Sequence, residues 1–332
     1  MKKILFIGTG GTIASELNGG ALSPALTAEQ LLRHVPEVSH FCSVDAVQLF
    51  TLDSTNITPA HWLAMAEKIE ENYDRYDGFV IAHGTDTMAY TAAALSYLIQ
   101  NSKKPVVITG AQRPIGFDTT DSKQNLCDSF LCAASDGLSG VLIVFGGQVL
   151  LGTRARKTRS KSFSAFSSPN YPPLAAVQSG RLVPYFNPTA GDTRFYRTLD
   201  PSVGLLKLTP GTDADVLRFM LNKYKALVIE SFGVGGLPDG GIHAAVTEAV
   251  ARGVTVVLTT QVQSEGTDLS VYNVGYGLAA LGVLEAFDMT PEACFTKLMW
   301  ILAVTDDRDA RRRLFYTPVS HDILPPAGYT DV

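Results

Sequence analysis

The alternation of short apolar runs with amphipathic stretches is the feature that most limits the fold of this chain. The pairs, in chain order, are Lys3–Ile7 then Ala28–Val35, Val44–Leu49 then Ala60–Tyr73, Gly78–Ile81 then Thr87–Ile99, and Val106–Thr109 then Ser122–Ala134, with a further run at Gly140–Phe145. Strand-like runs that alternate with helical patterns indicate α/β units on a mainly parallel sheet. Thr27 and the pair Thr58-Pro59 are typical helix starts, which supports this reading.

A second, smaller α/β region is expected after a change in composition. Prolines, glycine and polar residues interrupt the apolar rhythm at Pro184–Asp192 and again at Asp200-Pro201. Beyond them, strands are predicted at Gly204–Leu208, Ala226–Glu230 and Val254–Thr259, with helices at Ala214–Asn222 and Ile242–Arg252. The sequence of 332 residues, 46% of them apolar, therefore predicts two domains. We place them at 1–186, the larger N-terminal domain with a mainly parallel sheet flanked by helices, and at 204–332, the smaller C-terminal α/β domain, joined by a linker at 187–203.

Charge and cysteine usage indicate an intracellular protein with a small polar ligand. A net charge of −5 gives no general reason to expect nucleic acid or anionic lipid as a partner. The apolar run that follows Met1 is too short for a signal peptide, and no apolar stretch approaches the roughly 20 residues of a membrane helix. The four cysteines (Cys42, Cys127, Cys132 and Cys294) show no Cys-x-x-Cys spacing, which fits reduced thiols in a cytoplasm. A cytoplasmic location is the expectation.

Two threonine-bearing loops, each after an apolar run, are the strongest functional signal. They are Gly8-Thr-Gly-Gly-Thr-Ile-Ala14 and His83-Gly-Thr-Asp-Thr87. Ends of parallel strands can open onto one crevice, so both loops can place hydroxyls around one small substrate. Ile13 stands where the dinucleotide fingerprint requires glycine, and no Walker A lysine follows. This argues against a nucleotide-binding oxidoreductase, while a plain tight turn with Thr12 as a helix cap stays open.

A threonine hydroxyl becomes a nucleophile only when a base takes its proton. Thr85, Asp86 and Lys157 could supply a hydroxyl relay that ends in a Lys–Asp pair. The plainer alternatives are a helix cap for the first two and an exposed charge for Lys157. No Gly-x-Ser-x-Gly elbow occurs. His83 has no further His or Cys near it to complete a metal site, so a packed or hydrogen-bonded histidine is predicted there.

Four segments together resemble the bacterial-type L-asparaginase family, most closely its cytoplasmic type I branch. They are Gly10–Ala14, His83–Tyr90, Thr109–Pro114 and Phe163–Asn170, and the resemblance spans essentially the whole chain. It implies hydrolysis of the side-chain amide of L-asparagine to L-aspartate and ammonia, with no metal or organic cofactor. It also implies a homo-oligomer, dimer or tetramer.

The resemblance also assigns residues. Thr12 would be the primary nucleophile and Thr85 the second catalytic threonine, with Lys157 and Asp86 completing a Thr-Lys-Asp triad. Substrate contacts are implied for Ser54 at the α-carboxylate, with Thr55 beside it, for Asp86 at the α-ammonium, and for Ala111. An ordinary turn hydroxyl is the alternative for Ser54. The sequence leaves open whether Thr12 forms an acyl-enzyme or assists a water that attacks directly.

The chain departs from the family pattern in two places. The loop Glu16–Pro24 lacks the tyrosine that members commonly carry there, although Asn18-Gly19-Gly20 could act as its hinge. In the segment with Gln261 and Ser264, which lies near subunit contacts in similar proteins, Val262 replaces a cysteine often found at an allosteric site. A dual glutaminase-asparaginase stays open, since one methylene changes binding by only about 1–3 kcal/mol. So does a catalytically weak amide sensor.

Overall fold

The computed structural model describes residues 1–18, 21–187, 191–271 and 273–325. The chain divides into two compact units, Met1–Arg197 and Thr198–Val332. The boundary falls inside the segment predicted as a linker, 187–203, which also contains β14 (Arg194–Phe195), an antiparallel partner of β6 (Ile99–Gln100). Residues 188–190 of that segment and Gly19-Gly20 of the predicted hinge lie outside the described residues.

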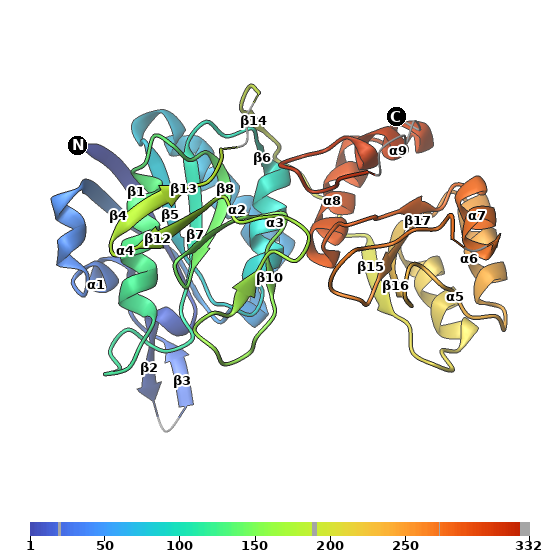
Figure 1. The fold of residues 1–332 in the computed structure, drawn as a ribbon, viewed down its shortest axis with the longest axis horizontal. Helices are drawn as coiled ribbons and strands as arrows, with labels where there is room; N and C mark the ends of the chain where they lie inside the picture. Colours follow the sequence, from blue (N-terminus) through green and yellow to red (C-terminus); the bar gives the residue numbers. More distant parts are fainter. Residues whose placement is uncertain (19–20, 188–190, 272, 326–332) are drawn as a thin grey trace. The chain divides into compact units, whose positions relative to one another are not determined.

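The first unit is built on an eight-stranded sheet (Figure 1). Its spatial order is β13 (Arg181–Pro184), β12 (Ala175–Gln178), β9 (Gln148–Leu151), β8 (Gly140–Phe145), β7 (Pro105–Thr109), β5 (Gly78–Ala82), β1 (Lys2–Gly10) and β4 (Cys42–Leu52). The five strands from β8 to β4 are parallel, and β9, β12 and β13 continue the sheet in antiparallel pairs. The predicted mainly parallel sheet is thus confirmed. The antiparallel extension has no counterpart in the alternating pattern, because its short strands carry no helices between them.

Helices cover both faces of this sheet. They are α1 (Ala28–Leu32), α2 (Pro59–Asn72), α3 (Met88–Leu98) and α4 (Ser122–Ala133). Phe6 packs against Phe130 of α4 at 5.3 Å between ring centroids, whereas Phe79, on the opposite face, stacks on Tyr73 just after α2. Apolar residues in succession along β1 are buried on both sides, which explains why its sequence shows no alternation. The predicted caps form: Thr27 closes a capping box with Gln30, and Pro59 opens α2 after Thr58.

The second unit has its own parallel sheet and core. Its strands are β15 (Val203–Lys207), β16 (Ala226–Ser231), β17 (Thr255–Thr260) and β18 (Leu284–Glu285), in that order. The helices are α5 (Ala214–Lys223), α6 (Ile242–Ala251), α7 (Asn273–Ala280), α8 (Pro291–Val304) and α9 (Arg308–Tyr316). Leu217, Ile229, Val246 and Leu258 are among the buried residues of the core. The two-domain α/β fold is therefore confirmed. Among the described residues, no helix has the length and apolarity needed to cross a bilayer.

Strand order fixes where a ligand can bind in the first unit. β1 pairs with β4 on one side and β5 on the other, so the chain changes direction across the sheet at this strand. In open α/β sheets, ligands bind outside the carboxyl ends of the strands at such a switch point. The loops after β1, β4, β5 and β7 all leave from this edge, and they carry most of the predicted site.

Candidate active site

Two glycine loops meet at the switch point with their backbones nearly in contact. A Cβ added to Gly11, after β1, would lie 2.3 Å from the backbone nitrogen of Gly84, after β5. Gly11 has φ of 79°, in the left-handed region that favours glycine. No side chain fits between these loops. Thr12 and Thr85 are the residues that follow these two glycines, one in each loop.

Thr12 is the first residue of a short 3₁₀ turn, Thr12–Ala14, whose N-cap is Gly11. The alternative that Thr12 is itself the cap is therefore wrong. Thr12 is partly exposed, and the backbone N–H of Ser15 donates to its carbonyl oxygen. A partly exposed threonine beside the Thr85 loop is accessible to a ligand.

Lys157 connects the second threonine to the neighbouring carboxylate. It lies on β10 (Arg156–Lys157), which pairs with β11 (Phe166–Ser167) in a short hairpin. Its Nζ donates to Thr85 Oγ1 at 2.7 Å and to Asp86 Oδ1 at 2.6 Å. The Lys157 side chain is 17% exposed and that of Asp86 is 59% exposed. The alternative that Lys157 is a free surface charge is therefore wrong.

The loop after β4 adds Ser54 and Thr55. Ser54 is buried, and a Cβ on Gly84 would lie 2.7 Å from its Oγ. Its carbonyl accepts a hydrogen bond from Thr87 Oγ1 at 2.7 Å, which ties this loop to the one that carries Thr85. Thr55 is exposed, and its hydroxyl donates to Asp53 Oδ1 at 2.8 Å. Ser54 thus lies against the glycine contact, whereas Thr55 takes part in a local turn.

The loop after β7 completes this edge of the sheet. Ala111 is fully buried and its side chain belongs to the hydrophobic core, so the structure does not expose it to a ligand. The next residue, Gln112, accepts a hydrogen bond from Thr85 Oγ1 at 3.2 Å. Sequence reasoning missed Gln112. It lies in the segment Thr109–Pro114, but nothing in its spacing points to Thr85.

The His83 side chain is buried and hydrogen-bonded within the protein, and it stabilises the loop after β5. It is fully buried, with Nδ1 2.6 Å from Gly84 O and Nε2 3.0 Å from Thr91 Oγ1. Nδ1 must donate to the carbonyl, so Nε2 accepts from the Thr91 hydroxyl, which itself accepts from Trp62 Nε1 at 2.9 Å. Burial lowers the pKa of His83 from 6.5 to about 4, and the ring is neutral at pH 7. The predicted packed and hydrogen-bonded histidine is confirmed.

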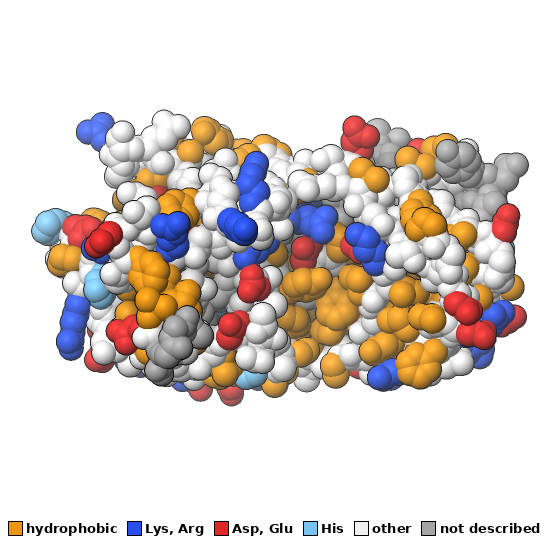
Figure 2. Space-filling view, turned by 90° about the horizontal axis from the view of Figure 1, so that it is seen from below, with side chains coloured by type: hydrophobic (Ala, Val, Ile, Leu, Met, Phe, Trp, Pro, Cys, Tyr) orange, Lys and Arg blue, Asp and Glu red, His pale blue; other side chains and the backbone are white. Residues whose placement is uncertain are grey.

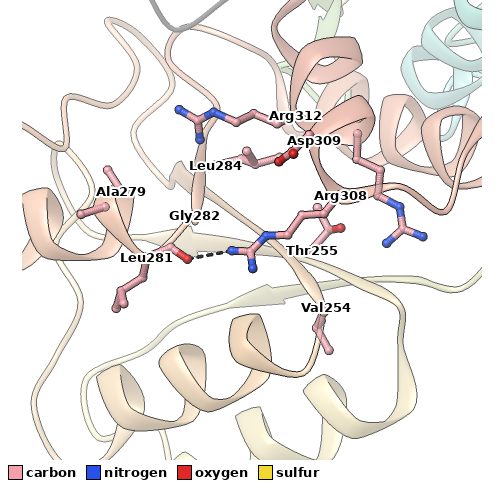
Figure 3. A pocket seen from close by; sticks show the side chains of 12 residues that line it. Val254, Thr255, Ala279, Leu281, Gly282, Leu284, Arg308, Asp309 and Arg312 are labelled. Carbon is pink, nitrogen blue, oxygen red and sulfur yellow. Dashed lines mark hydrogen bonds between the residues drawn. The ribbon is translucent and has the colours of Figure 1, made fainter.

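The second unit contains a pocket of about 420 Å³, which is lined in part by arginines (Figure 3). Its wall includes Gly282, Arg308 and Arg312. Arg308 Nη2 donates to Leu281 O at 2.8 Å. Guanidinium groups stay protonated and cannot act as a base. Arg311, on the same helix α9, is instead buried: it is 8% exposed, and its Nε donates to Thr305 O at 3.1 Å.

Both units match family models of known proteins. Residues 3–190 match the family model "Asparaginase, N-terminal" and residues 202–315 match "Glutaminase/Asparaginase C-terminal domain". The chain is 38% identical to the L-asparaginase of Thermococcus kodakarensis over 97% of this chain and 99% of that one. It is 36% identical to a subunit of the glutamyl-tRNA(Gln) amidotransferase of Pyrococcus furiosus, over 97% of this chain and 77% of the relative. The crystal structure of L-asparaginase I from Vibrio cholerae superimposes with a TM-score of 0.88 at 32% identity, over 98% of this chain and 99% of the other. The two threonine loops, the two-unit fold and these matches agree, and the chain belongs to the L-asparaginase family.

Proposed function

We propose that this protein hydrolyses the side-chain amide of L-asparagine to L-aspartate and ammonia, with Thr12 as the nucleophile. The observation that carries the proposal is the position of Lys157 Nζ, within hydrogen-bond distance of both Thr85 Oγ1 and Asp86 Oδ1 beside the Gly11–Gly84 contact. A hydroxyl bonded to a lysine can relay a proton that the attacking group loses.

In the proposed reaction, Thr12 Oγ attacks the amide carbon and its proton passes toward the Thr85–Lys157 pair. Backbone N–H groups at the strand ends would stabilise the oxyanion. The C–N bond then breaks as the leaving nitrogen takes up a proton, ammonia departs, and water hydrolyses the acyl-threonine to release aspartate. Asp86, with its side chain 59% exposed, would pair with the substrate α-ammonium, while Ser54 would bind the α-carboxylate.

The test is ammonia release from L-asparagine and L-glutamine at equal concentrations, with wild type, Thr12→Ala and Thr85→Ala side by side. Thr247→Ala is the matched control, because its hydroxyl bonds to the carbonyl of His243 within α6 of the second unit. Fast release from asparagine that collapses in both loop variants and persists in the control is the expected result. Undiminished turnover in Thr12→Ala would refute the nucleophile.

The same assay separates the alternatives. Equal rates on both amides would establish a dual glutaminase-asparaginase. Co-purified ligand with negligible turnover in folded protein would favour a sensor. Because one relative belongs to a glutamyl-tRNA(Gln) amidotransferase, release from free asparagine without any tRNA also distinguishes that activity from simple hydrolysis. A direct attack by water, with Thr12 assisting, would leave no acyl-enzyme to trap in a single turnover.

We also propose that the protein is cytoplasmic and forms a homo-oligomer, dimer or tetramer. Hydrophobic side chains gather on the face shown in Figure 2. The exposed apolar residues of the second unit include Phe219, 65% exposed, and Val271, 53% exposed. Exposed apolar surface of this kind favours self-association. Light scattering coupled to size exclusion should give a mass of two or four chains, and a monomer at micromolar concentration would refute the oligomer.

A further inference from the structure

We propose that Gln112 is a positioning residue that fixes the direction of the Thr85 hydroxyl. This inference rests on the proposed function, because it concerns how Thr85 is held for the reaction. Gln112 follows β7, and its side chain lies between the loop after β5 and the β10–β11 hairpin. It touches both at hydrogen-bond distance.

The orientation of the Gln112 amide follows from its neighbours. Its Nε2 lies 3.1 Å from the carbonyl oxygen of Ser162 in the hairpin. A carbonyl oxygen can only accept, so the amide nitrogen must face Ser162. The amide oxygen therefore faces Thr85, and the Thr85 hydroxyl hydrogen is donated to it across 3.2 Å.

This arrangement leaves one direction open at Thr85 Oγ1. The oxygen is bonded to its own Cβ, donates its hydrogen to Gln112 and accepts a hydrogen bond from Lys157 Nζ at 2.7 Å. A hydroxyl oxygen has one hydrogen and two lone pairs. The remaining lone pair is therefore fixed in space and can accept a hydrogen bond from the attacking group. When that proton moves to Thr85 Oγ1, the hydrogen that Thr85 held on Gln112 must pass to Lys157 Nζ, so that the hydroxyl stays neutral.

Gln112 is itself held from its backbone. The N–H groups of Gln112 and Arg113 both donate to the buried carboxylate of Asp121, at 2.9 and 3.1 Å. Asn125 donates to the same carboxylate at 3.2 Å and to Gly110 O at 3.0 Å. A buried carboxylate that accepts several N–H bonds makes a rigid support. The hairpin that carries Lys157 and the loop that carries Thr85 are thus joined by Gln112 as well as by their direct contact.

The experiment compares Gln112→Met, which keeps the length but loses both hydrogen bonds, with Gln112→Glu, which keeps an acceptor for Thr85. We expect kcat of Gln112→Met to fall about 10-fold with KM within about threefold of wild type, because substrate contacts remain while the hydroxyl loses its orientation. Gln112→Glu should recover most of kcat. Gln124→Met is the matched control, since that side chain bonds to Asp128 at 2.6 Å on α4, away from the threonine loops.

Unchanged kcat in Gln112→Met would overturn the inference, and so would a loss of kcat matched by an equal rise in KM or a Gln112→Glu variant as slow as Gln112→Met. If Gln112→Met fails to fold, the comparison of Gln112→Glu with wild type decides: kcat within about threefold supports the acceptor role, and a larger loss overturns it. These outcomes are distinct from failure of the proposed function, in which wild type releases no ammonia or Thr85→Ala stays active.

Discussion

Two lysine–aspartate pairs of nearly equal length have opposite settings in this molecule. Lys157 and Asp86 are 2.6 Å apart in the first unit, with side chains 17% and 59% exposed. Lys297 and Asp322 are 2.7 Å apart in the second unit, and both side chains are fully buried. The first pair shares its lysine with a threonine hydroxyl beside a glycine contact, and the second gives its lysine to the carbonyl of Thr317.

The difference shows that distance alone does not make a pair functional. A buried pair satisfied by backbone has no route to a ligand, and it holds two chain segments together at a high desolvation cost. A pair that is open to water contributes little to stability, but it can exchange protons and meet a substrate. We therefore expect removal of Lys157 to lower activity and removal of Lys297 to lower stability.

The largest effect is expected from Lys157→Met, which should lower kcat about 10³-fold because proton relay from the threonine is lost. The melting temperature should change little, since the pair is partly exposed. Steady-state ammonia release and a thermal melt check both. Lys161→Met, an exposed lysine on the same hairpin, is the control and should remain active. Near-normal kcat in Lys157→Met would show that the Lys157–Asp86 pair has no role in activity.

Lys297→Met should leave kcat per folded molecule intact and lower the free energy of unfolding by about 3–5 kcal/mol. The reason is that Asp322 would be left buried without its cation. Urea unfolding of the single variant and of Lys297→Met/Asp322→Leu provides the measurement, and the double variant should regain most of the loss. A single variant as stable as wild type would show that the buried pair is dispensable.

We expect low pH to destabilise the first unit because of His83, and not because of the Lys157–Asp86 pair. The pKa of His83 is about 4 in the folded protein, against 6.5 for the ordinary side chain. Between these values only the unfolded chain binds the proton. The free energy of unfolding is therefore unaffected by His83 above about pH 6.5, and it falls progressively as pH drops from 6.5 to 4; this is the loss of stability due to His83. It reaches at most about 3 kcal/mol.

Hydrogen exchange at pH 7 and pH 5, resolved by segment, would detect this loss in β5 and its neighbours. His83→Gln should remove the part of this pH dependence that His83 causes, at a cost in absolute stability. His40→Gln, at an exposed histidine, should preserve the pH dependence. Equal pH dependence in wild type and His83→Gln would contradict the assignment to His83.

The smallest effect is expected for stability in Asp86→Asn, a loss of less than about 1 kcal/mol that shrinks further at high salt. Chemical denaturation at two salt concentrations measures it. Ammonia release should nevertheless fall in this variant, since Asp86 is proposed to bind the substrate ammonium. A stability loss above about 2 kcal/mol would mean that the open pair is structural after all.

The sequence predicts where most residues of the candidate site lie, because they follow the ends of strands. Gly10 and Gly11 mark a backbone that needs positive φ, and apolar runs before Thr12 and Thr85 place both threonines at the same edge of a parallel sheet. The assignment of their roles came from resemblance to a family. The position of Lys157 was harder to predict, because a basic residue in a basic segment is usually an exposed surface residue.

The sequence alone determined the α/β class, the two units and the two threonine loops, since hydrophobic period and glycine placement are local properties. Only the tertiary structure decided that Lys157 reaches Thr85 and Asp86 while Lys297 is buried, and that Gln112 accepts a hydrogen bond from Thr85, 27 residues away in sequence. Those outcomes depend on which side chains meet across the fold. No local pattern encodes such long-range contacts, because they follow from how strands and loops far apart in the chain are packed.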